Sequence, residues 1–382
     1  MTTEGPVESA WCEVSPARIA QNLRHVLKRL PPQTRLCAVV KADAYGHGIE
    51  NTVSLLMAQG ITSVGISANA EARALRDAGF DGVILRLRTA TPDEVAGAVF
   101  DGVEEQVGSL KGLLALRARL GEGRLPKLHL SLNAGGMSRD ALELSTPQGR
   151  RDCAEIVAMA AGRIVGICTH FPSNQEHELA ASINRFQRDL AWVFANSGLR
   201  RCDVVTHAGS TLTLCAGLDP QVDMMRIGAL LFGIAAPGPD FGLAMALKSR
   251  VISLGSYPKG STIGYDRTTT LSRESVLASV ALGYANGYRR QLSPGGEVLI
   301  RGQLCPVLGE VSMNTLVADV SAVPAVALND EVVAFGHQQG RVIEAQSMER
   351  LSGTILADLF TDWGLRNRRI PVGACDLCPM RN

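Results

Sequence analysis

The first two-thirds of the chain alternates short runs of β-branched residues with helical stretches. Such alternation is typical of βα units and of a parallel sheet. The expected strands are Arg35–Lys41, Ser63–Ser67, Gly82–Leu87, Gly102–Val107, Lys127–Asn133, Arg163–His170, Cys202–Gly209 and Met224–Gly233. Helices are expected between most of them, for example at Ala70–Gly79, Leu110–Leu120 and Ile183–Ser197. This inventory predicts an α/β fold with a closed (β/α)8 TIM-type barrel, and an open doubly wound sheet is the alternative.

The character of the sequence changes after about Pro237. From Met245 to Phe335, β segments are divided by Gly, Pro, Ser and Asn, and helical periodicity returns only at Ala345–Gly364. The expected β segments include Ser275–Leu282, Glu297–Arg301, Gln303–Leu308, Thr315–Val320 and Glu331–Phe335. Two prolines and a glycine in Ala236–Phe241 favour a linker. We therefore expect a barrel domain at residues 1–240 and a mainly β domain at residues 241–382; the strand-like stretch within residues 1–14 could pair with the second domain instead.

The charge balance points to a small-molecule ligand. Lys and Arg number 38 against 37 for Asp and Glu, which leaves no basic surplus for nucleic acid or an anionic membrane surface. No apolar run approaches the roughly 20 residues of a membrane span. The opening residues lack the basic and then apolar pattern of a secretion signal, so a cytoplasmic location is expected.

The cysteines indicate reduced thiols. The chain has 9, an odd number scattered along its length, which argues against a disulfide framework. Cys375 and Cys378 have the spacing of a metal clip, but no second pair of ligands follows and a structural zinc site needs four. We therefore expect free thiols and no metal site.

Polar residues follow several of the expected barrel strands. Lys41, Arg139, His170 and Ser210 come at or after strand ends, and Arg226 lies within the last strand. Singly, each has an ordinary explanation: a solvated lysine, a core histidine, a helix-capping serine. A guanidinium in an apolar run is harder to explain, because a buried charge needs a partner or a ligand. Active sites of such barrels form at the C-terminal ends of the strands, so these residues together predict a site there.

The sequence Val-Val-Lys-Ala-Asp-Ala-Tyr-Gly-His-Gly at residues 39–48 resembles the cofactor-lysine motif of the alanine racemases. Further segments agree with that family in the same order along the chain. They are Thr169–Phe171, Met225–Gly228, Ile263–Thr268, Gly283–Tyr288 and Gly309–Asn314. The resemblance covers nearly the whole chain and implies a pyridoxal 5'-phosphate enzyme that racemises amino acids as a homodimer.

The resemblance also implies roles for the barrel residues. Lys41 would form the Schiff base with pyridoxal phosphate, while Tyr45, Ser210 and the backbone around Gly228 would hold the phosphate. Arg226 would face the pyridine nitrogen. Because arginine does not give up its proton, the ring nitrogen would stay unprotonated and the cofactor would be a weaker electron sink. That suits return of a proton rather than decarboxylation or transamination.

Racemisation needs an acid and a base on opposite faces of the α-carbon. Lys41 can serve one face, and the resemblance implies Tyr265 for the other. A phenol has an ordinary pKa near 10, so its surroundings must tune it; in this family His170 and Arg226 do so. Arg139 would contact the cofactor's phenolic oxygen and the substrate carboxylate.

The resemblance implies that three of these residues come from the second subunit. They are Tyr265, Met313 near the substrate carboxylate, and Tyr284 at the entrance. Each active site would then be completed by the dimer partner. Without Lys41 in the chain, Tyr265 would be read simply as a half-exposed tyrosine on a β hairpin.

Some segments depart from the usual alanine racemase pattern. Asn-Ala-Gly-Gly-Met-Ser-Arg at residues 133–139 replaces an Asp-Thr-Gly-Met form, and Ser131 stands near the position of a lysine that can be carbamylated. Together with Ser312–Asn314, Gly353–Leu359 and Trp363–Gly364, this form resembles the broad-specificity amino-acid racemases. Substrates would be alanine only, or also longer and basic amino acids. Members of that branch are often exported, so a periplasmic location is expected if a leader has been removed.

Two alternative functions stay open. Thr206–Ser210 resembles the His-x-Gly-Ser phosphate loop of barrel-type basic amino-acid decarboxylases, which keeps a lyase as one alternative. A non-catalytic pyridoxal phosphate carrier is the other, since small single-barrel proteins share the lysine motif. The setting of Tyr265 in Gly-Tyr-Asp-Arg-Thr favours the racemase. The tyrosine that often contacts phosphate near the C-terminus in alanine racemases has no clear counterpart around Thr354.

Overall fold

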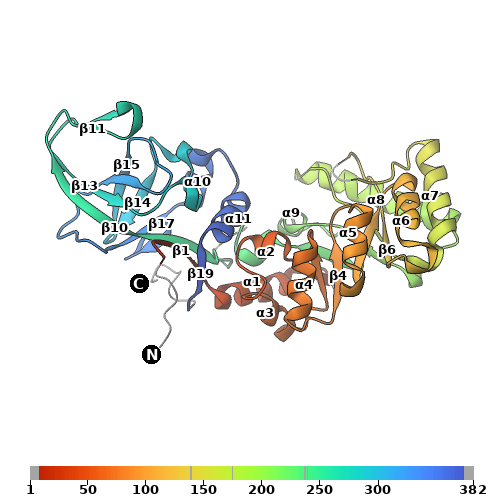
Figure 1. Cartoon of the computed structure of the whole chain (residues 1–382). Helices are drawn as coiled ribbons and strands as arrows, with labels where there is room; N and C mark the ends of the chain where they lie inside the picture. The colour runs from red at the N-terminus through yellow and green to blue at the C-terminus, as the bar shows by residue number, and fades with distance from the viewer. Residues whose placement is uncertain (1–7, 138–139, 174, 236–237, 239, 374–382) are drawn as a thin grey trace. The chain divides into compact units, whose positions relative to one another are not determined.

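The computed structural model describes residues 8–137, 140–173, 175–235, 238 and 240–373 (Figure 1). Contacts divide the chain into two compact units. The barrel unit comprises Ala20–Ala44 and Thr52–Phe241. The sheet unit comprises the described residues up to Ile19, the segment Tyr45–Asn51 and the described residues from Gly242 onward. In the described ranges, no helix has both the length and the apolar character needed to cross a membrane.

The barrel unit is built on parallel strands that close on themselves. The strands are β2 (Arg35–Val39), β3 (Ser63–Ile66), β4 (Val83–Arg86), β5 (Val103–Val107), β6 (Leu128–Ser131), β7 (Ile164–Cys168), β8 (Val205–His207) and β9 (Met224–Ile227). Each pairs with the next strand in the chain, and β9 pairs in parallel with β2. The predicted closed barrel is confirmed. The open sheet is wrong, because the first and last strands are hydrogen-bonded neighbours.

Helices connect the barrel strands, and α1 (Pro16–Arg29) leads into the first of them. The connecting helices include α3 (Val53–Ala58), α4 (Asn69–Asp77), α5 (Pro92–Gly97), α6 (Leu110–Leu120), α7 (Pro147–Ala160), α8 (Glu176–Asn196) and α9 (Thr211–Cys215). The helix expected at Leu110–Leu120 has these bounds in the structure. The helix expected from Ile183 begins earlier, at Glu176. Its first turn has little apolar periodicity but carries Glu176 and Glu178, and acidic residues favour a helix N-terminus.

The sheet unit contains a nine-stranded sheet in the order β18-β17-β14-β15-β16-β13-β10-β1-β19, with a further pairing of β17 to β10. Its strands are β1 (Ala10–Val14), β10 (Met245–Tyr257), β13 (Ser275–Val280), β14 (Glu297–Ile300), β15 (Gln303–Leu308), β16 (Leu316–Asp319), β17 (Glu331–Gln338), β18 (Arg341–Ile343) and β19 (Arg368–Pro371). The long strand β10 pairs with β1, β13 and β17, and β1 also pairs in parallel with β19. The N-terminal strand is therefore part of this sheet. The predicted mainly β character of the second part of the chain is confirmed.

The expected helical stretch Ala345–Gly364 is two helices rather than one. α10 (Ala345–Ser352) ends at Gly353, whose φ of 67° lies in the left-handed region that favours glycine, and α11 (Leu356–Arg366) follows. The rings of Phe335, Phe360 and Trp363 pack together, with centroids 5.2 to 5.8 Å apart. These aromatic side chains form a buried core between β17 and α11.

The short segment after Lys41 packs on α11. The ring of His47 lies 5.3 Å from that of Phe360, centroid to centroid. A Cβ atom on Gly364 would lie 1.8 Å from the carbonyl oxygen of Gly46, so only a glycine allows this approach. The end of the lysine motif is thus held by α11.

Candidate active site

Lys41 stands at the C-terminal end of β2, where the chain enters an unusual turn. The Val40 amide still donates to the carbonyl of Gly65 on β3 at 2.8 Å, so pairing continues up to the residue before the lysine. Residues 42 to 45 then have φ values between 51° and 57°. This left-handed conformation costs L-amino acids about 1–2 kcal/mol each. Surrounding contacts must therefore hold the turn, and Lys41 is the residue that it follows.

The carboxylate of Glu71, in the first turn of α4, supplies part of that support. Its Oε1 accepts from the Ala42 amide at 2.6 Å, and its Oε2 accepts from the amides of Ser67 and Ala68 at 2.7 and 3.0 Å. The Glu71 residue is only 8% exposed. One buried carboxylate thus joins the turn after Lys41 to the end of β3. Sequence reasoning missed Glu71, because a glutamate in the first turn of a helix usually just caps it.

Arg226 on β9 points its guanidinium into the barrel. The residue is 8% exposed. Its Nη1 donates to the His207 carbonyl and lies 3.0 Å from His207 Nδ1, and its Nη2 donates to the Thr169 carbonyl at 2.7 Å. These acceptors supply the partners that a buried cation requires. The neighbouring Thr169 Oγ1 is buried and has no hydrogen-bond partner among the described residues.

Further polar side chains continue from Arg226 across the barrel interior. His207 Nε2 lies 2.9 Å from His129 Nδ1, and His129 Nε2 lies 2.9 Å from Glu104 Oε2. Burial, reinforced by the neighbouring His129 and Arg226, lowers the pKa of His207 well below its ordinary value. The imidazole of His207 is therefore neutral and can accept a hydrogen bond from Arg226.

Sequence reasoning also missed His129 and Glu104, although a signal existed. Glu104 belongs to the strand Val-Glu-Glu-Gln-Val, in which every residue is buried, and His129 lies between two buried leucines in β6. Charged or titratable residues in a buried strand need partners. The strand pattern alone does not say which side chains meet.

Four of the predicted barrel residues lie at one rim. Lys41 follows β2, Gly228 follows β9, Ser210 follows β8 and His170 follows β7. These four strands are consecutive neighbours in the order β7-β8-β9-β2, and all are parallel. Their C-terminal ends therefore lie together. The Thr211 hydroxyl, which accepts from the Leu230 amide at 3.3 Å, links the loops after β8 and β9.

Some predicted residues lie outside the described ranges. Arg139, expected at the end of the fifth strand, is among them, and so are Cys375 and Cys378. The binding role predicted for Arg139 and the free thiols predicted for Cys375 and Cys378 therefore stay predictions. Lys41, His170 and Ser210 are each half-buried at the rim, as a site open to a small ligand requires.

The sheet unit brings its three predicted residues onto connected loops. Tyr265 lies at the tip of the hairpin formed by β11 (Thr262–Ile263) and β12 (Thr269–Thr270). A Cβ on Gly264, beside it, would lie 2.8 Å from the Glu310 amide nitrogen, so the hairpin packs against the loop that leads to Met313. That loop in turn accepts hydrogen bonds at the Ser312 and Met313 carbonyls from the amides of Tyr284 and Ala285, at 3.1 and 2.9 Å.

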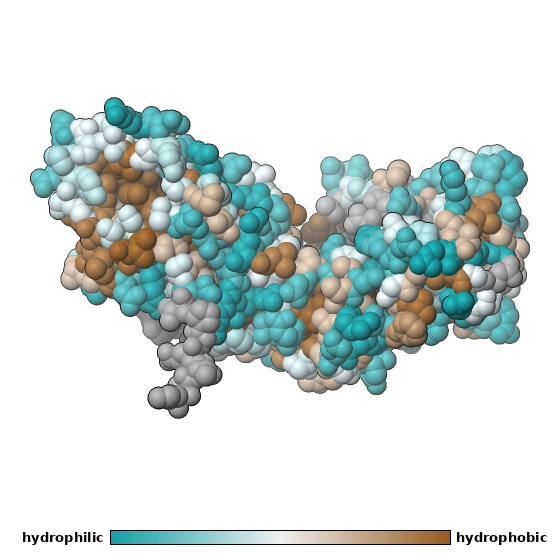
Figure 2. Space-filling model, in the orientation of Figure 1, coloured by the Kyte–Doolittle hydropathy of each residue, from teal (hydrophilic) through white to brown (hydrophobic). Residues whose placement is uncertain are grey.

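All three of these side chains are exposed within the single chain. Tyr265 is 65% exposed, Met313 55% and Tyr284 40%. Figure 2 shows hydrophobic residues gathered on one face of the sheet unit. Exposed aromatic and apolar side chains on adjoining loops are typical of a surface that meets a ligand or another chain.

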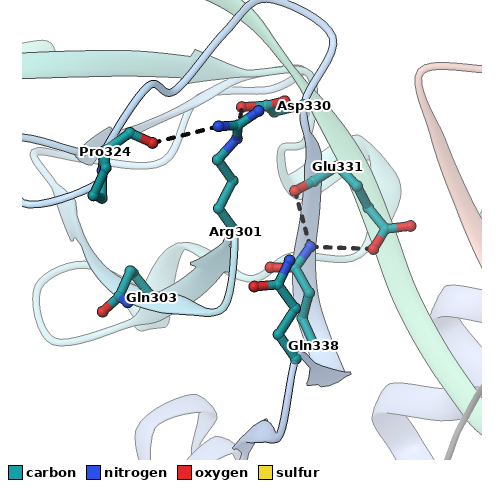
Figure 3. A pocket seen from close by; sticks show the side chains of 7 residues that line it. Arg301, Gln303, Pro324, Asp330, Glu331 and Gln338 are labelled. Carbon is teal, nitrogen blue, oxygen red and sulfur yellow. Dashed lines mark hydrogen bonds and ion pairs between the residues drawn. The ribbon is translucent and has the colours of Figure 1, made fainter.

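A pocket of about 760 Å³ on the sheet unit contains none of the predicted site residues. Its polar groups pair with one another (Figure 3): Arg301 Nε lies 2.9 Å from Asp330 Oδ2, and Gln338 Nε2 donates to Glu331 Oε1 at 3.1 Å. Because these groups satisfy each other, the pocket is a weaker candidate than the barrel rim.

Comparisons with known proteins identify the family and the fold. The family model described as alanine racemase, N-terminal domain, matches residues 14–236, and the alanine racemase, C-terminal domain, matches residues 244–371. A broad specificity amino-acid racemase from Pseudomonas taetrolens is 40% identical over 366 residues, covering 95% of this chain and 89% of the relative. A lysine racemase from Proteus mirabilis is 37% identical over 369 residues, covering 96% of this chain and 90% of the relative.

Solved structures share the fold over nearly the whole length. An alanine racemase from Bacillus anthracis with bound L-Ala-P has a TM-score of 0.86 and 25% identity, covering 97% of both chains. An alanine racemase from Bartonella henselae with covalently bound pyridoxal phosphate has a TM-score of 0.83 and 20% identity, covering 96% of this chain and 100% of the other. With both domain models matched in order and relatives similar along the full chain, this protein belongs to the alanine racemase family.

Proposed function

We propose that this chain is a pyridoxal-phosphate-dependent racemase that interconverts L- and D-amino acids, including alanine and larger or basic amino acids. The observation that carries the proposal is the position of Lys41 at the end of β2, the strand that pairs with β9 and its buried Arg226. Family membership supports the reaction. The relatives named broad specificity amino-acid racemase and lysine racemase support a substrate range beyond alanine.

The chemistry of the barrel residues fits pyridoxal phosphate. Lys41 offers a primary amine for covalent attachment. The buried Thr169 Oγ1 beside Arg226, which has no hydrogen-bond partner within the described part of the chain, suits a polar ligand. When bound, the cofactor withdraws electrons from the α-carbon and so makes its proton easier to remove. Tyr45, Ser210 and Gly228 would hold the phosphate, and Arg139 the phenolic oxygen and the substrate carboxylate.

Arg226 would set the strength of that electron withdrawal. An arginine side chain stays protonated and only donates hydrogen bonds. Its contacts with His207 and the Thr169 carbonyl hold it in one place, so it can donate to the ring nitrogen without transferring a proton. This arrangement favours returning a proton to the α-carbon over cleaving a neighbouring bond.

Two residues would move the proton. Lys41 removes or delivers it on one face of the α-carbon, and the phenol of Tyr265 does so on the other. His170, half-buried at the rim, would assist the phenol together with Arg226. A racemase needs both groups, because a single base would return the proton to the face from which it came.

The dimer would complete each site. Tyr265, Tyr284 and Met313 are exposed in the single chain and lie on connected loops, which supports their contribution to the partner's barrel in a homodimer. A symmetric dimer of this kind would form two equivalent sites.

The reaction is tested by incubating the purified protein with single enantiomers of alanine, lysine or arginine in deuterated water. The expected result is loss of optical purity with deuterium at the α-carbon, because the abstracted proton exchanges with solvent. Release of carbon dioxide would instead identify a decarboxylase. A visible cofactor band with no turnover would identify a carrier.

Substitutions of Lys41 and Tyr265 test the role of each residue separately. Lys41→Ala is expected to abolish covalent cofactor attachment, seen as loss of the cofactor's visible absorbance. Tyr265→Phe should keep that absorbance and lower kcat by about 100-fold or more, the usual contribution of a general acid or base, and more strongly for one enantiomer. Tyr257→Phe, at another exposed tyrosine of the sheet unit, is the control and should change neither. Equal and mild losses in both directions for Tyr265→Phe would contradict the two-base assignment.

The shared site is tested by mixing two inactive chains. Co-expressed Lys41→Ala and Tyr265→Phe subunits would place both defects in one site of a mixed dimer and leave the other site intact. Because half of randomly paired dimers are mixed, about one quarter of the wild-type activity is expected. Activity no higher than that of either variant alone would place Tyr265 and Lys41 of each site in the same subunit.

Glu71→Gln tests the support of the turn after Lys41. The amide of glutamine keeps one oxygen that can accept, but its NH2 group would face backbone N–H groups that the second carboxylate oxygen now holds, so the turn should loosen. We expect the Kd for pyridoxal phosphate to rise about tenfold, equivalent to about 1.4 kcal/mol, measured by titrating the cofactor-free protein. Glu94 occupies the same early position in α5 and accepts from the Thr91 amide, so Glu94→Gln is the matched control. Equal effects of the two variants would contradict a specific role of Glu71.

A further inference from the structure

A line of buried polar side chains crosses the barrel interior from β9 to β5. It runs from Arg226 to His207 on β8, then to His129 on β6 and Glu104 on β5, with donor–acceptor distances of 3.0, 2.9 and 2.9 Å. None of the four residues is more than 8% exposed. The line begins at the residue proposed to face the cofactor ring and ends in the N-terminal half of β5.

The chemistry of its two ends fixes the direction of every hydrogen bond. A guanidinium only donates and an ionised carboxylate only accepts. His207 Nδ1 therefore accepts from Arg226, and its Nε2–H donates to His129 Nδ1. His129 Nε2–H then donates to Glu104. These directions place the ring proton of each imidazole at Nε2, and the lowered pKa of His207 agrees with a neutral His207 ring.

The far end is anchored as a carboxylate. Glu104 Oε1 lies 3.2 Å from Lys127 Nζ, and the Lys127 side chain is 63% exposed. Burial by itself raises the pKa of the Glu104 carboxyl, but the hydrogen bonds from His129 and Lys127 and the charge of Lys127 more than offset it, so the pKa lies below its usual value. The acceptor end of the line therefore keeps its charge.

A glycine makes room for the line. β7 lies between β6 and β8 in the barrel, and its Gly166 is in register with His129. A Cβ atom at Gly166 would lie 2.0 Å from His129 Nδ1. Only a residue without a side chain lets the His129 ring cross β7 and reach His207.

We propose that Glu104 and His129 are positioning residues that act through His207 to hold Arg226 in one orientation toward the cofactor ring. The cofactor part of this inference rests on the proposed function. The carboxylate fixes the tautomer of His129, His129 fixes that of His207, and His207 then presents an acceptor rather than an N–H group to the guanidinium. With the opposite tautomer, two donors would face each other at Arg226.

The test compares His129→Gln with His129→Leu in protein carrying nitrogen-15-labelled histidine. Gln keeps an acceptor for His207 and a donor for Glu104, whereas Leu keeps neither. In cofactor-free wild-type protein and in the Gln variant, the ring nitrogens of His207 are expected to show a single Nε2–H tautomer. In the Leu variant they should show a mixture, and the Kd for pyridoxal phosphate should rise about tenfold, against less than about twofold for Gln.

Glu104→Gln is the second variant, for use if circular dichroism shows that the His129→Leu protein does not fold. Its amide can both donate and accept, so it no longer fixes the tautomer of His129. His207, two residues away in the line, should then also show a mixture of tautomers. A wild-type His207 protonated at Nδ1, or a tautomer that is the same in wild type, His129→Leu and Glu104→Gln, would overturn the proposal. The His207 tautomer is measured without cofactor, so this test does not depend on the proposed function. The proposed function is refuted by a different result, a wild-type protein that does not bind pyridoxal phosphate or does not racemise amino acids.

Discussion

The hydrogen bonds between β9 and β2 are the contact on which the barrel and its candidate site depend. They pair Cys37 with Arg226 and Ala38 with Ile227, so strands from opposite ends of the barrel sequence become neighbours. The pairing closes the sheet and makes the strand that leads to Lys41 the neighbour of the strand that contains Arg226. Without closure, the two residues would stand at opposite edges of an open sheet.

Two buried charges then organise the surroundings of this contact. The guanidinium of Arg226 is held by the carbonyls of Thr169 and His207, and the carboxylate of Glu71 is held by backbone amides. A buried charge is tolerated when its hydrogen-bonding capacity is met, and each partner that meets it is fixed in return. The charges therefore determine the geometry of the strand ends and of the left-handed turn after Lys41.

Much of the barrel could be predicted because local patterns report local structure. Each expected barrel strand is present with shorter bounds: β2 ends at Val39 rather than Lys41, and the strand expected at Met224–Gly233 ends at Ile227, where a turn of 3-10 helix follows. The rim positions of Lys41, His170 and Ser210 follow from strand order and direction alone. The predictions were less accurate for α8 and for the C-terminal helices. The start of α8 was placed too late because its first turn lacks apolar periodicity, and the break between α10 and α11 was missed because a single glycine causes it.

The parts that could not be predicted depend on contacts between distant strands. His129 and Glu104 look like isolated polar residues in buried strands, and only the register of β6 with β7, and the missing side chain at Gly166, bring His129 to His207. Glu71 and Glu94 occupy equivalent positions in their helices, yet only Glu71 reaches the turn after Lys41.

The sequence by itself determined the alternation of strands and helices, the family motif around Lys41 and the residues available for chemistry, because these depend on neighbours along the chain. The tertiary structure alone decided which buried charges meet, which imidazole nitrogen faces which partner and which glutamate supports the lysine. Those choices depend on register and packing between segments far apart in the sequence, where an offset of one residue turns a side chain to the other face of its strand.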